Sequence, residues 1–255
     1  MLAKARTLAA DEAIVDLEDA VAVADKEAAR ALAVEALRAG SLAPTTALRI
    51  NARSTPWWED DLRAAAEARP DVVVLPKVES AGEVAAAREL LPQSIGLEAQ
   101  IETARGLVEA ERIAAAGHGL EALVLGPADL AASLGVPVLS IGAGTAEYAL
   151  ARVAAAARAF GLQPIDGPHA LLDDEEGLVG SAQRALANGY DGKWVIHPSQ
   201  IEPVNRVFTP TAEEVERAER IVAAAEGAAR FDRELVDAAS RRLAESLLRR
   251  AGRVS

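Results

Sequence analysis

Two carboxylates in this chain follow short apolar runs, at positions where they could bind a metal ion. Glu102 closes the run Leu97–Ile101, and Asp129 follows the run Leu123–Leu125, each with helical sequence after it. Because the ends of successive strands meet on one face of an alternating strand–helix sheet, the two side chains should face one cavity. Two hard oxygen ligands with room left for water and substrate suit Mg²⁺. The alternative is that each acid only caps its following helix.

Other polar side chains end the neighbouring apolar runs, in positions equivalent to those two carboxylates. Arg49 offers a planar guanidinium fork for a carboxylate or keto oxygen, or it pairs with an acid such as Glu18. We expect Glu18, from the acidic cluster Asp16–Asp19, to act at the site through water. Lys77 could form a Schiff base, but a structural or charge-balancing role is favoured because a Mg²⁺ site makes an imine unnecessary.

Seven apolar segments alternate with helical ones, which predicts a parallel sheet covered by helices. The expected strands are Ala13–Leu17, Ala47–Asn51, Asp71–Lys77, Ile95–Ile101, Ala122–Leu125, Gln163–Asp166 and Lys193–His197. An open doubly wound sheet and a (βα)₈ TIM barrel both fit this alternation. No GxGxxG motif follows the first strand, and polar residues end nearly every strand, which favours the α/β barrel. A barrel needs an eighth strand, and this missing first strand is expected to precede residue 1.

The last part of the chain is predicted to be helical only. Helices are expected at 211–227 and 236–251, and Thr211 with Glu214 has the spacing of a capping box. We therefore expect a (βα)₈ barrel over residues 1–208 and a C-terminal helical extension or lid over 209–255.

Composition narrows the functional classes. The chain has 255 residues and a net charge of −12, which argues against nucleic acid as the main partner. It has no cysteine, so disulfides, thiolate catalysis and Cys-ligated metals are excluded. No uninterrupted apolar stretch is long enough to cross a membrane, and the first residues lack the apolar core of a signal peptide. The expectation is a cytoplasmic enzyme with no membrane partner.

A series of motifs resembles one known family over most of the chain. The motifs are DLEDAV (16–21), RIN (49–51), VLPKVES (74–80), IETARG (101–106), DLAASLG (129–135), PIDG (164–167), GYDGKWVIHPSQIEPVN (189–205) and VFTPTAEEVERA (207–218). In this order they resemble the citrate lyase β-subunit-like proteins. These belong with the malyl-CoA and citramalyl-CoA lyases and the HpcH/HpaI-type aldolases. The resemblance implies a (βα)₈ barrel and Mg²⁺-dependent cleavage or formation of a carbon–carbon bond next to a thioester.

The resemblance also assigns roles by motif position. Glu102 and Asp129 fall on the metal ligands, and Arg49 falls on the arginine that holds the substrate's carboxylate or carbonyl. The positions that contact CoA or substrate in the family are matched by Lys4, Lys26, Ile196 and His197. The family's N-terminal strand, which contributes to the CoA pocket, has no counterpart in this sequence.

Asp237 falls on an acid that reaches a neighbouring subunit's site in the family. It is therefore expected to exchange a proton with the substrate carbon in a homotrimer or hexamer, or else it only starts the last helix. The favoured activity is a lyase of citramalyl-, malyl- or citryl-CoA through a metal-stabilised enolate. The alternatives are a Mg²⁺-dependent class II-type aldolase for a free 2-keto-hydroxy acid and a non-catalytic homologue.

Overall fold

The computed structural model describes residues 2–136, 144–223, 229–231 and 234–253. The chain forms two compact units, residues 1–204 and 205–255. The boundary expected from the sequence, after residue 208, falls slightly later than this division, at the end of one helix. The two units are described in turn.

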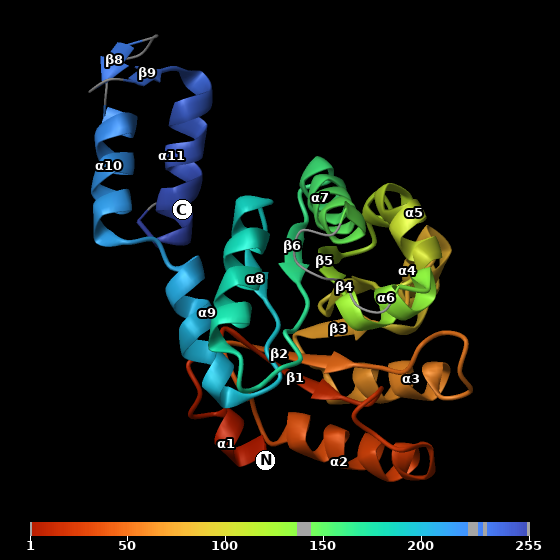
Figure 1. Ribbon diagram of the computed structural model, residues 1–255. Coiled ribbons are helices and arrows are strands. Elements are labelled where there is room, and N and C mark those ends of the chain that lie inside the picture. The colour runs from red at the N-terminus through yellow and green to blue at the C-terminus, as the bar shows by residue number, and fades with distance from the viewer. Residues whose placement is uncertain (1, 137–143, 224–228, 232–233, 254–255) are drawn as a thin grey trace. The chain divides into compact units, whose positions relative to one another are not determined.

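The first unit is built on a sheet of seven parallel strands (Figure 1). The strands are β1 (Glu12–Asp16), β2 (Thr45–Arg49), β3 (Val72–Leu75), β4 (Gly96–Ile101), β5 (Leu120–Leu125), β6 (Gln163–Asp166) and β7 (Gly192–Lys193). All residues of β3 and β4 are buried, as expected for strands covered on both faces. The seven strands predicted from the sequence are confirmed.

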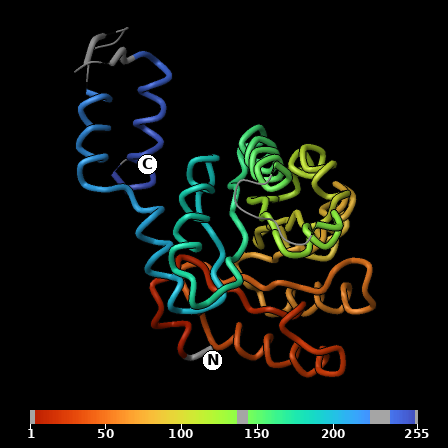
Figure 2. Tube along the Cα trace, viewed as in Figure 1, coloured from red at the N-terminus to blue at the C-terminus, as the bar shows by residue number. Residues whose placement is uncertain are grey.

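The order of the strands distinguishes between the two folds that the sequence allows, a doubly wound sheet and a barrel. Each strand pairs with the next one in the chain, from β1 to β7, without a reversal of order. A doubly wound sheet reverses its order at a switch point, whereas a barrel winds continuously in one direction. The Cα trace turns around the sheet in sequence order, as the colours of Figure 2 show. The sheet is therefore a curled, incomplete βα barrel, and no eighth strand joins β7 to β1 within the described ranges.

Helices connect the strands and surround them. They are α1 (Leu2–Ala5), the 3₁₀ turn Val23–Asp25 with α2 (Lys26–Arg38), α3 (Trp58–Ala68), α4 (Ala81–Leu90), α5 (Ala104–Ala114), α6 (Pro127–Leu134), α7 (Gly144–Ala159), α8 (Glu175–Ala187), the 3₁₀ turn Pro198–Gln200 and α9 (Ile201–Phe208). Thr103 caps α5 by accepting a hydrogen bond from the Gly106 amide, at 2.9 Å. Gly106 must lack a side chain, because a Cβ there would lie 2.5 Å from the Val78 carbonyl oxygen. This contact seats α5 against the loop that follows β3.

The last strand is shorter than the sequence predicted. Only Gly192 and Lys193 pair with β6, where a strand over Lys193–His197 was expected. The Ile196 amide donates to the Gln200 side chain instead of to a neighbouring strand, and the His197 ring caps the 3₁₀ turn that follows. The chain leaves the sheet early because the 3₁₀ turn Pro198–Gln200 takes these hydrogen bonds.

The second unit is a pair of helices joined by a hairpin. It contains α10 (Ala212–Ala223), the antiparallel strands β8 (Ala229–Phe231) and β9 (Glu234–Val236), and α11 (Ala238–Arg250). The predicted capping box is confirmed, since the Glu214 amide donates to Thr211 Oγ1 and the Thr211 amide donates to Glu214 Oε2. The two helices pack through a small apolar core of Ala218, Ile221, Ala244 and Leu248.

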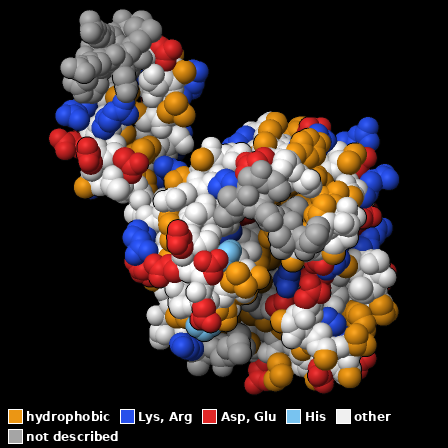
Figure 3. Space-filling view, viewed as in Figure 1, with side chains coloured by type: hydrophobic (Ala, Val, Ile, Leu, Met, Phe, Trp, Pro, Cys, Tyr) orange, Lys and Arg blue, Asp and Glu red, His pale blue; other side chains and the backbone are white. Residues whose placement is uncertain are grey.

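The surface carries both signs of charge. On the face drawn in Figure 3, Lys and Arg side chains are interspersed with Asp and Glu and do not form one basic face. No helix in the described part of the chain is long and apolar enough to span a membrane.

Candidate metal and substrate site

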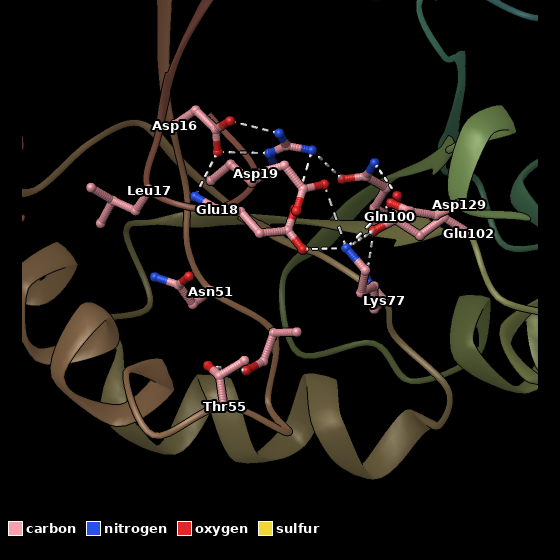
Figure 4. A network of polar contacts seen from close by, with 12 residues as sticks. Asp16, Leu17, Glu18, Asp19, Asn51, Thr55, Lys77, Gln100, Glu102 and Asp129 are labelled. Atoms are coloured by element: carbon pink, nitrogen blue, oxygen red, sulfur yellow. Dashed lines mark hydrogen bonds and ion pairs between the residues drawn. The ribbon is translucent and has the colours of Figure 1, made fainter. Parts of the chain in front are cut away.

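The first element of the site is a fixed arginine at the end of β2. Arg49 pairs in register with Asp16, the last residue of β1, so their side chains emerge next to each other. Arg49 Nε donates to Asp16 Oδ1 at 2.9 Å, and its terminal nitrogen donates to Oδ2 at 2.6 Å. A second terminal nitrogen lies 3.3 Å from Glu18 Oε2. The fork is therefore oriented by Asp16, and its remaining edge faces Glu18 and Gln100. Figure 4 labels these three partners.

A lysine lies among the carboxylates at the neighbouring strand ends. Lys77 Nζ is 2.5 Å from Glu18 Oε1, 3.2 Å from Asp129 Oδ2, 3.6 Å from Asp19 Oδ2 and 3.9 Å from Glu102 Oε1. Burial lowers the pKa of Lys77, but the hydrogen bond to Glu18 and the surrounding negative charges outweigh it and raise the pKa above its ordinary value. Lys77 thus has the charge-balancing position favoured from the sequence.

Glu102 is held firmly at the end of β4. Its side chain is only 2% exposed, Oε2 accepts from the Gln100 amide nitrogen at 2.6 Å, and Oε1 accepts from the Lys77 backbone amide at 3.0 Å. Gly126 leaves room for it, because a Cβ at this glycine would lie 2.5 Å from Glu102. Burial raises the pKa of Glu102 to about 8, with Lys77 opposing the shift and the charges of Glu18 and Asp129 adding to it.

Asp129 approaches the same point from the first turn of α6, and its side chain is 39% exposed. Glu102 and Asp129 therefore both lie within 4 Å of one positive charge, Lys77 Nζ. This donor set fits Mg²⁺, which prefers carboxylate oxygens and retains several positions for water and substrate. No three acidic or histidine side chains in the described residues enclose an ion by themselves. The protein would supply two carboxylates and leave the remaining positions open.

Glu18 connects the arginine and the lysine. It is 5% exposed, it contacts both Arg49 and Lys77, and its carboxylate follows the end of β1. Burial raises the pKa of Glu18, although both cations oppose the shift. The structure therefore brings Arg49, Glu18, Glu102 and Asp129 together, as the sequence predicted.

The residues expected to contact CoA lie in different environments. Lys26 is buried, and its Nζ donates to the carbonyl oxygens of Leu17 and Glu18, both at 2.7 Å. Its ammonium thus supports the backbone that carries Glu18, and a contact with CoA stays a prediction. Lys4 is exposed on α1.

The two residues expected to contact substrate follow β7. Ile196 is 58% exposed, and His197 is exposed, with its Nδ1 2.8 Å from Ser199 Oγ. Their roles also stay predictions.

Asp237 belongs to the second unit. It is exposed at the start of α11, where Oδ1 accepts from the amides of Ala239 and Ser240, both at 2.9 Å. The hydrogen bond from the Ser240 amide is the main cause that lowers its pKa. These are the contacts of a helix N-cap, so the helix-starting role is seen directly, and the role at a neighbouring subunit stays a prediction.

Three contributors to the site were missed or left without a role in the sequence reasoning. Gln100 contacts Glu102 and lies 3.4 Å from Arg49, and Asp16 orients the arginine. Trp194 places its ring 5.8 Å from the Arg49 guanidinium, in a cation–π contact. Alternation within the strand Ile95–Ile101 could have identified Gln100, since it shares a face with Glu102.

Comparisons with known proteins show which family and which relatives the chain is similar to. The family model described as HpcH/HpaI aldolase/citrate lyase matches residues 1–198, and a model described as a C–C bond lyase of the TIM-barrel fold matches residues 148–253. An L-malyl-CoA/β-methylmalyl-CoA lyase of Cereibacter sphaeroides is 37% identical, covering 97% of this chain and 89% of the relative. A (3S)-malyl-CoA thioesterase of the same species is 41% identical over 90% of this chain and 80% of the relative.

One similar solved structure was determined with ligands. It is the protein CitE from Mycobacterium tuberculosis in complex with magnesium, acetoacetate and coenzyme A. It is 40% identical to this chain with a TM-score of 0.82, and the match covers 98% of this chain and 91% of the CitE chain. Sequence and fold therefore agree over almost the whole length.

Proposed function

The chain belongs to the HpcH/HpaI aldolase/citrate lyase family, and from this premise we propose that it is a Mg²⁺-dependent carbon–carbon lyase of CoA thioesters. The membership confirms the family recognised from the sequence motifs. The proposed substrate is a 3-hydroxyacyl-CoA-type thioester such as malyl-, citramalyl- or citryl-CoA. The observation that carries the proposal is the convergence of Glu102 and Asp129 on one positive charge beside Arg49.

The proposed reaction needs no oxidant or second substrate. The substrate's hydroxyl group loses its proton, and the bond between the hydroxyl-bearing carbon and the carbon next to the thioester breaks. The first fragment leaves as a carbonyl compound, and the second takes a proton at carbon and remains a thioester. Negative charge develops on the thioester fragment during this cleavage, so catalysis requires positive charge and hydrogen-bond donors placed against it.

Each residue of the site has a proposed part in this reaction. Glu102 and Asp129 would hold Mg²⁺, which supplies Lewis-acid polarisation of substrate oxygens when it is bound. Arg49 would bind a substrate carboxylate or carbonyl through the edge that Asp16 leaves available. Glu18 would keep Arg49 oriented. Asp237 of a neighbouring subunit would donate the proton to carbon.

Product analysis tests this proposal. The protein is incubated with malyl-CoA, with citramalyl-CoA and with a free 2-keto-hydroxy acid, each with Mg²⁺ or with EDTA, and the products are separated by chromatography. The expected result is Mg²⁺-dependent formation of a shorter acyl-CoA and an equal amount of the oxo acid. Cleavage of a free 2-keto-hydroxy acid without CoA would favour the aldolase alternative. No turnover of either class would favour a non-catalytic homologue.

A second candidate activity is thioester hydrolysis, because the malyl-CoA thioesterase relative is 41% identical to this chain. Here water would add to the thioester carbonyl and the carbon–sulfur bond would break. The same assay distinguishes the two activities, since hydrolysis releases free CoA and the intact hydroxy acid, whereas the lyase forms acyl-CoA.

Assembly as a homotrimer or hexamer in the cytoplasm also belongs to the proposal. It is supported by the family resemblance and by the need for a second subunit if Asp237 acts on a neighbour. Light scattering after gel filtration measures the mass, and a monomer would contradict this part of the proposal.

A further inference from the structure

Lys77 stands at the point on which the proposed metal ligands converge. Its Nζ lies 3.2 Å from Asp129 and 3.9 Å from Glu102, and Glu18 lies closer still, at 2.5 Å. In Figure 4 the dashed contacts of these carboxylates meet at the Lys77 ammonium. Lys77 therefore occupies the position that a bound cation would need in order to contact Glu102 and Asp129 together.

The backbone of Lys77 is adapted to this position. Its φ is +52°, in the left-handed region that residues other than glycine adopt uncommonly. In this conformation the backbone amide donates to Glu102 Oε1 while the side chain reaches toward the other carboxylates. Unfavourable backbone conformations are found most often at functional sites, where the surrounding contacts maintain them. The conformation therefore supports a functional role for Lys77 at this site.

A cation stabilises the carboxyl groups around Lys77. Glu18 and Glu102 are 5% and 2% exposed, so water does little to solvate them. Arg49 is already engaged by Asp16 through two hydrogen bonds. Lys77 is thus the cation that contacts Glu18, Glu102 and Asp129 together within the described residues.

The lysine also has space to move. Its side chain is 30% exposed, and it lines a cavity of about 470 Å³ together with Arg53, Ser54, Glu79 and Glu83. A lysine ammonium is a point charge on a flexible four-carbon stem, so it can change partners without a change in the backbone. The carboxylates of Glu79 and Glu83 in this cavity offer it alternative partners.

We propose that Lys77 is an exchangeable counter-cation of the metal site, whose ammonium lies against Glu18, Glu102 and Asp129 until Mg²⁺ replaces it. On Mg²⁺ binding the side chain would move toward the Glu79–Glu83 cavity, while the backbone amide keeps its bond to Glu102. The inference rests on the proposed metal assignment. Lys77 would then be a positioning residue. It would weaken Mg²⁺ binding through competition, and it would keep the site folded when Mg²⁺ is absent.

Calorimetric titration with Mg²⁺ tests the competition. Wild type is compared with Lys77→Met, which removes the charge, with Lys77→Arg, which retains it, and with Arg53→Met, which removes a nearby charge from the cavity wall. The titrations of all four proteins are made at the same pH and ionic strength. We expect Lys77→Met to bind Mg²⁺ about tenfold more tightly, because a competing charge within 4 Å is lost. Lys77→Arg and Arg53→Met should change the affinity less than about twofold.

Thermal unfolding separates competition from a purely structural role. Lys77→Met should melt below wild type in EDTA, and Mg²⁺ should raise its melting temperature more than that of wild type. If Lys77→Met is unfolded in EDTA, Mg²⁺ should refold it. Unchanged or weaker Mg²⁺ affinity in Lys77→Met, or no refolding, overturns the inference. If wild type and Lys77→Met both fail to bind Mg²⁺, the metal assignment itself is wrong.

Lysine labelling provides a test in the unmodified protein. The chain has four lysines: Lys4, Lys26, Lys77 and Lys193. Trace acetylation followed by mass spectrometry should show that Mg²⁺ increases the modification of Lys77 severalfold relative to the exposed Lys4. Lys26 and Lys193, which donate hydrogen bonds to buried partners, should remain unchanged. Equal labelling of Lys77 with and without Mg²⁺ would contradict its displacement.

Discussion

Two groups of buried and partly buried carboxyl groups lie toward opposite ends of the same sheet, and they differ in their partners. Toward the carboxyl ends of the strands, Glu18 and Glu102 face the charges of Arg49 and Lys77. Toward the amino ends, Glu12 and Glu98 face each other, and Glu12 Oε1 and Glu98 Oε2 have no hydrogen-bond partner among the described residues. One group is arranged around cations, whereas the other brings two carboxyl groups together.

The comparison shows that a perturbed pKa does not identify a functional site by itself. Burial raises the pKa of Glu98 to about 8, with repulsion from Glu12 adding to it, and burial also raises the pKa of Glu102 to about 8. The two glutamates differ in what surrounds them, since only Glu102 lies beside a lysine and an aspartate that converge on one point. In a βα barrel the carboxyl ends of the strands carry chemistry and the amino ends carry stability. The predictions below test this division.

The largest effect is expected from the same substitution made at each end. Glu102→Gln should lower kcat/KM by about a thousandfold, because the amide cannot replace a charged metal ligand. Asp129→Asn should have an effect of similar size. Glu98→Gln is the matched control and should change kcat/KM less than about twofold. Steady-state assays with the thioester substrate measure all three, and equal losses in Glu98→Gln and Glu102→Gln would remove the distinction between the two groups.

The next largest effect is expected from replacing the planar guanidinium of Arg49, at the carboxyl end of β2, with an ammonium. Arg49→Lys should lower kcat/KM about a hundredfold, because a point charge cannot bind Asp16 and the substrate through a planar fork. The measurement is the same steady-state assay, and circular dichroism checks the fold. A variant with near-normal kcat/KM would exclude Arg49 from the substrate site.

A smaller effect tests whether the second unit completes a neighbour's site. Asp237→Ala and Glu102→Ala proteins should each be inactive, whereas co-assembled mixtures should regain up to about a quarter of the activity by random pairing of subunits. Activity is measured after subunit exchange has been verified by mass spectrometry. If exchange occurs and no activity returns, Asp237 acts only as the N-cap of α11.

The smallest effect concerns stability at the amino ends. Because the pKa of Glu98 is raised from 4.5 to about 8, the folded state holds its proton more tightly than the unfolded state. This contribution is complete below pH 4.5 and is lost as the pH rises through about 8. Glu98→Gln should therefore be more stable than wild type at pH 9, with a much smaller difference at pH 5. Urea unfolding at both pH values measures this, and a constant difference would contradict the raised pKa of Glu98.

The sequence predicted the parts of the site that depend on strand ends. Glu102, Asp129 and Arg49 were found because apolar runs mark where strands stop, and parallel strands stop on one side. The pairing of Arg49 with Asp16 depends on the register of β1 and β2, which no local pattern specifies.

Two other features depend on contacts between distant segments. The hydrogen bonds of Lys26 to the carbonyl groups at the end of β1 form because its long side chain folds back over that segment, while its contact with CoA stays a prediction. Glu98 lies inside a run of mostly apolar residues. Its approach to Glu12 depends on how β1 and β4 lie in the same barrel, which the sequence pattern does not specify.

The central claim is that the carboxylates at the strand carboxyl ends, and not those at the amino ends, bind Mg²⁺. Calorimetric titration of wild type, Glu98→Gln and Glu102→Gln with Mg²⁺ tests it most directly. We predict one Mg²⁺ site of similar affinity in wild type and Glu98→Gln, and no measurable binding in Glu102→Gln. Wild-type affinity in Glu102→Gln, or loss of binding in a folded Glu98→Gln protein, would contradict the account.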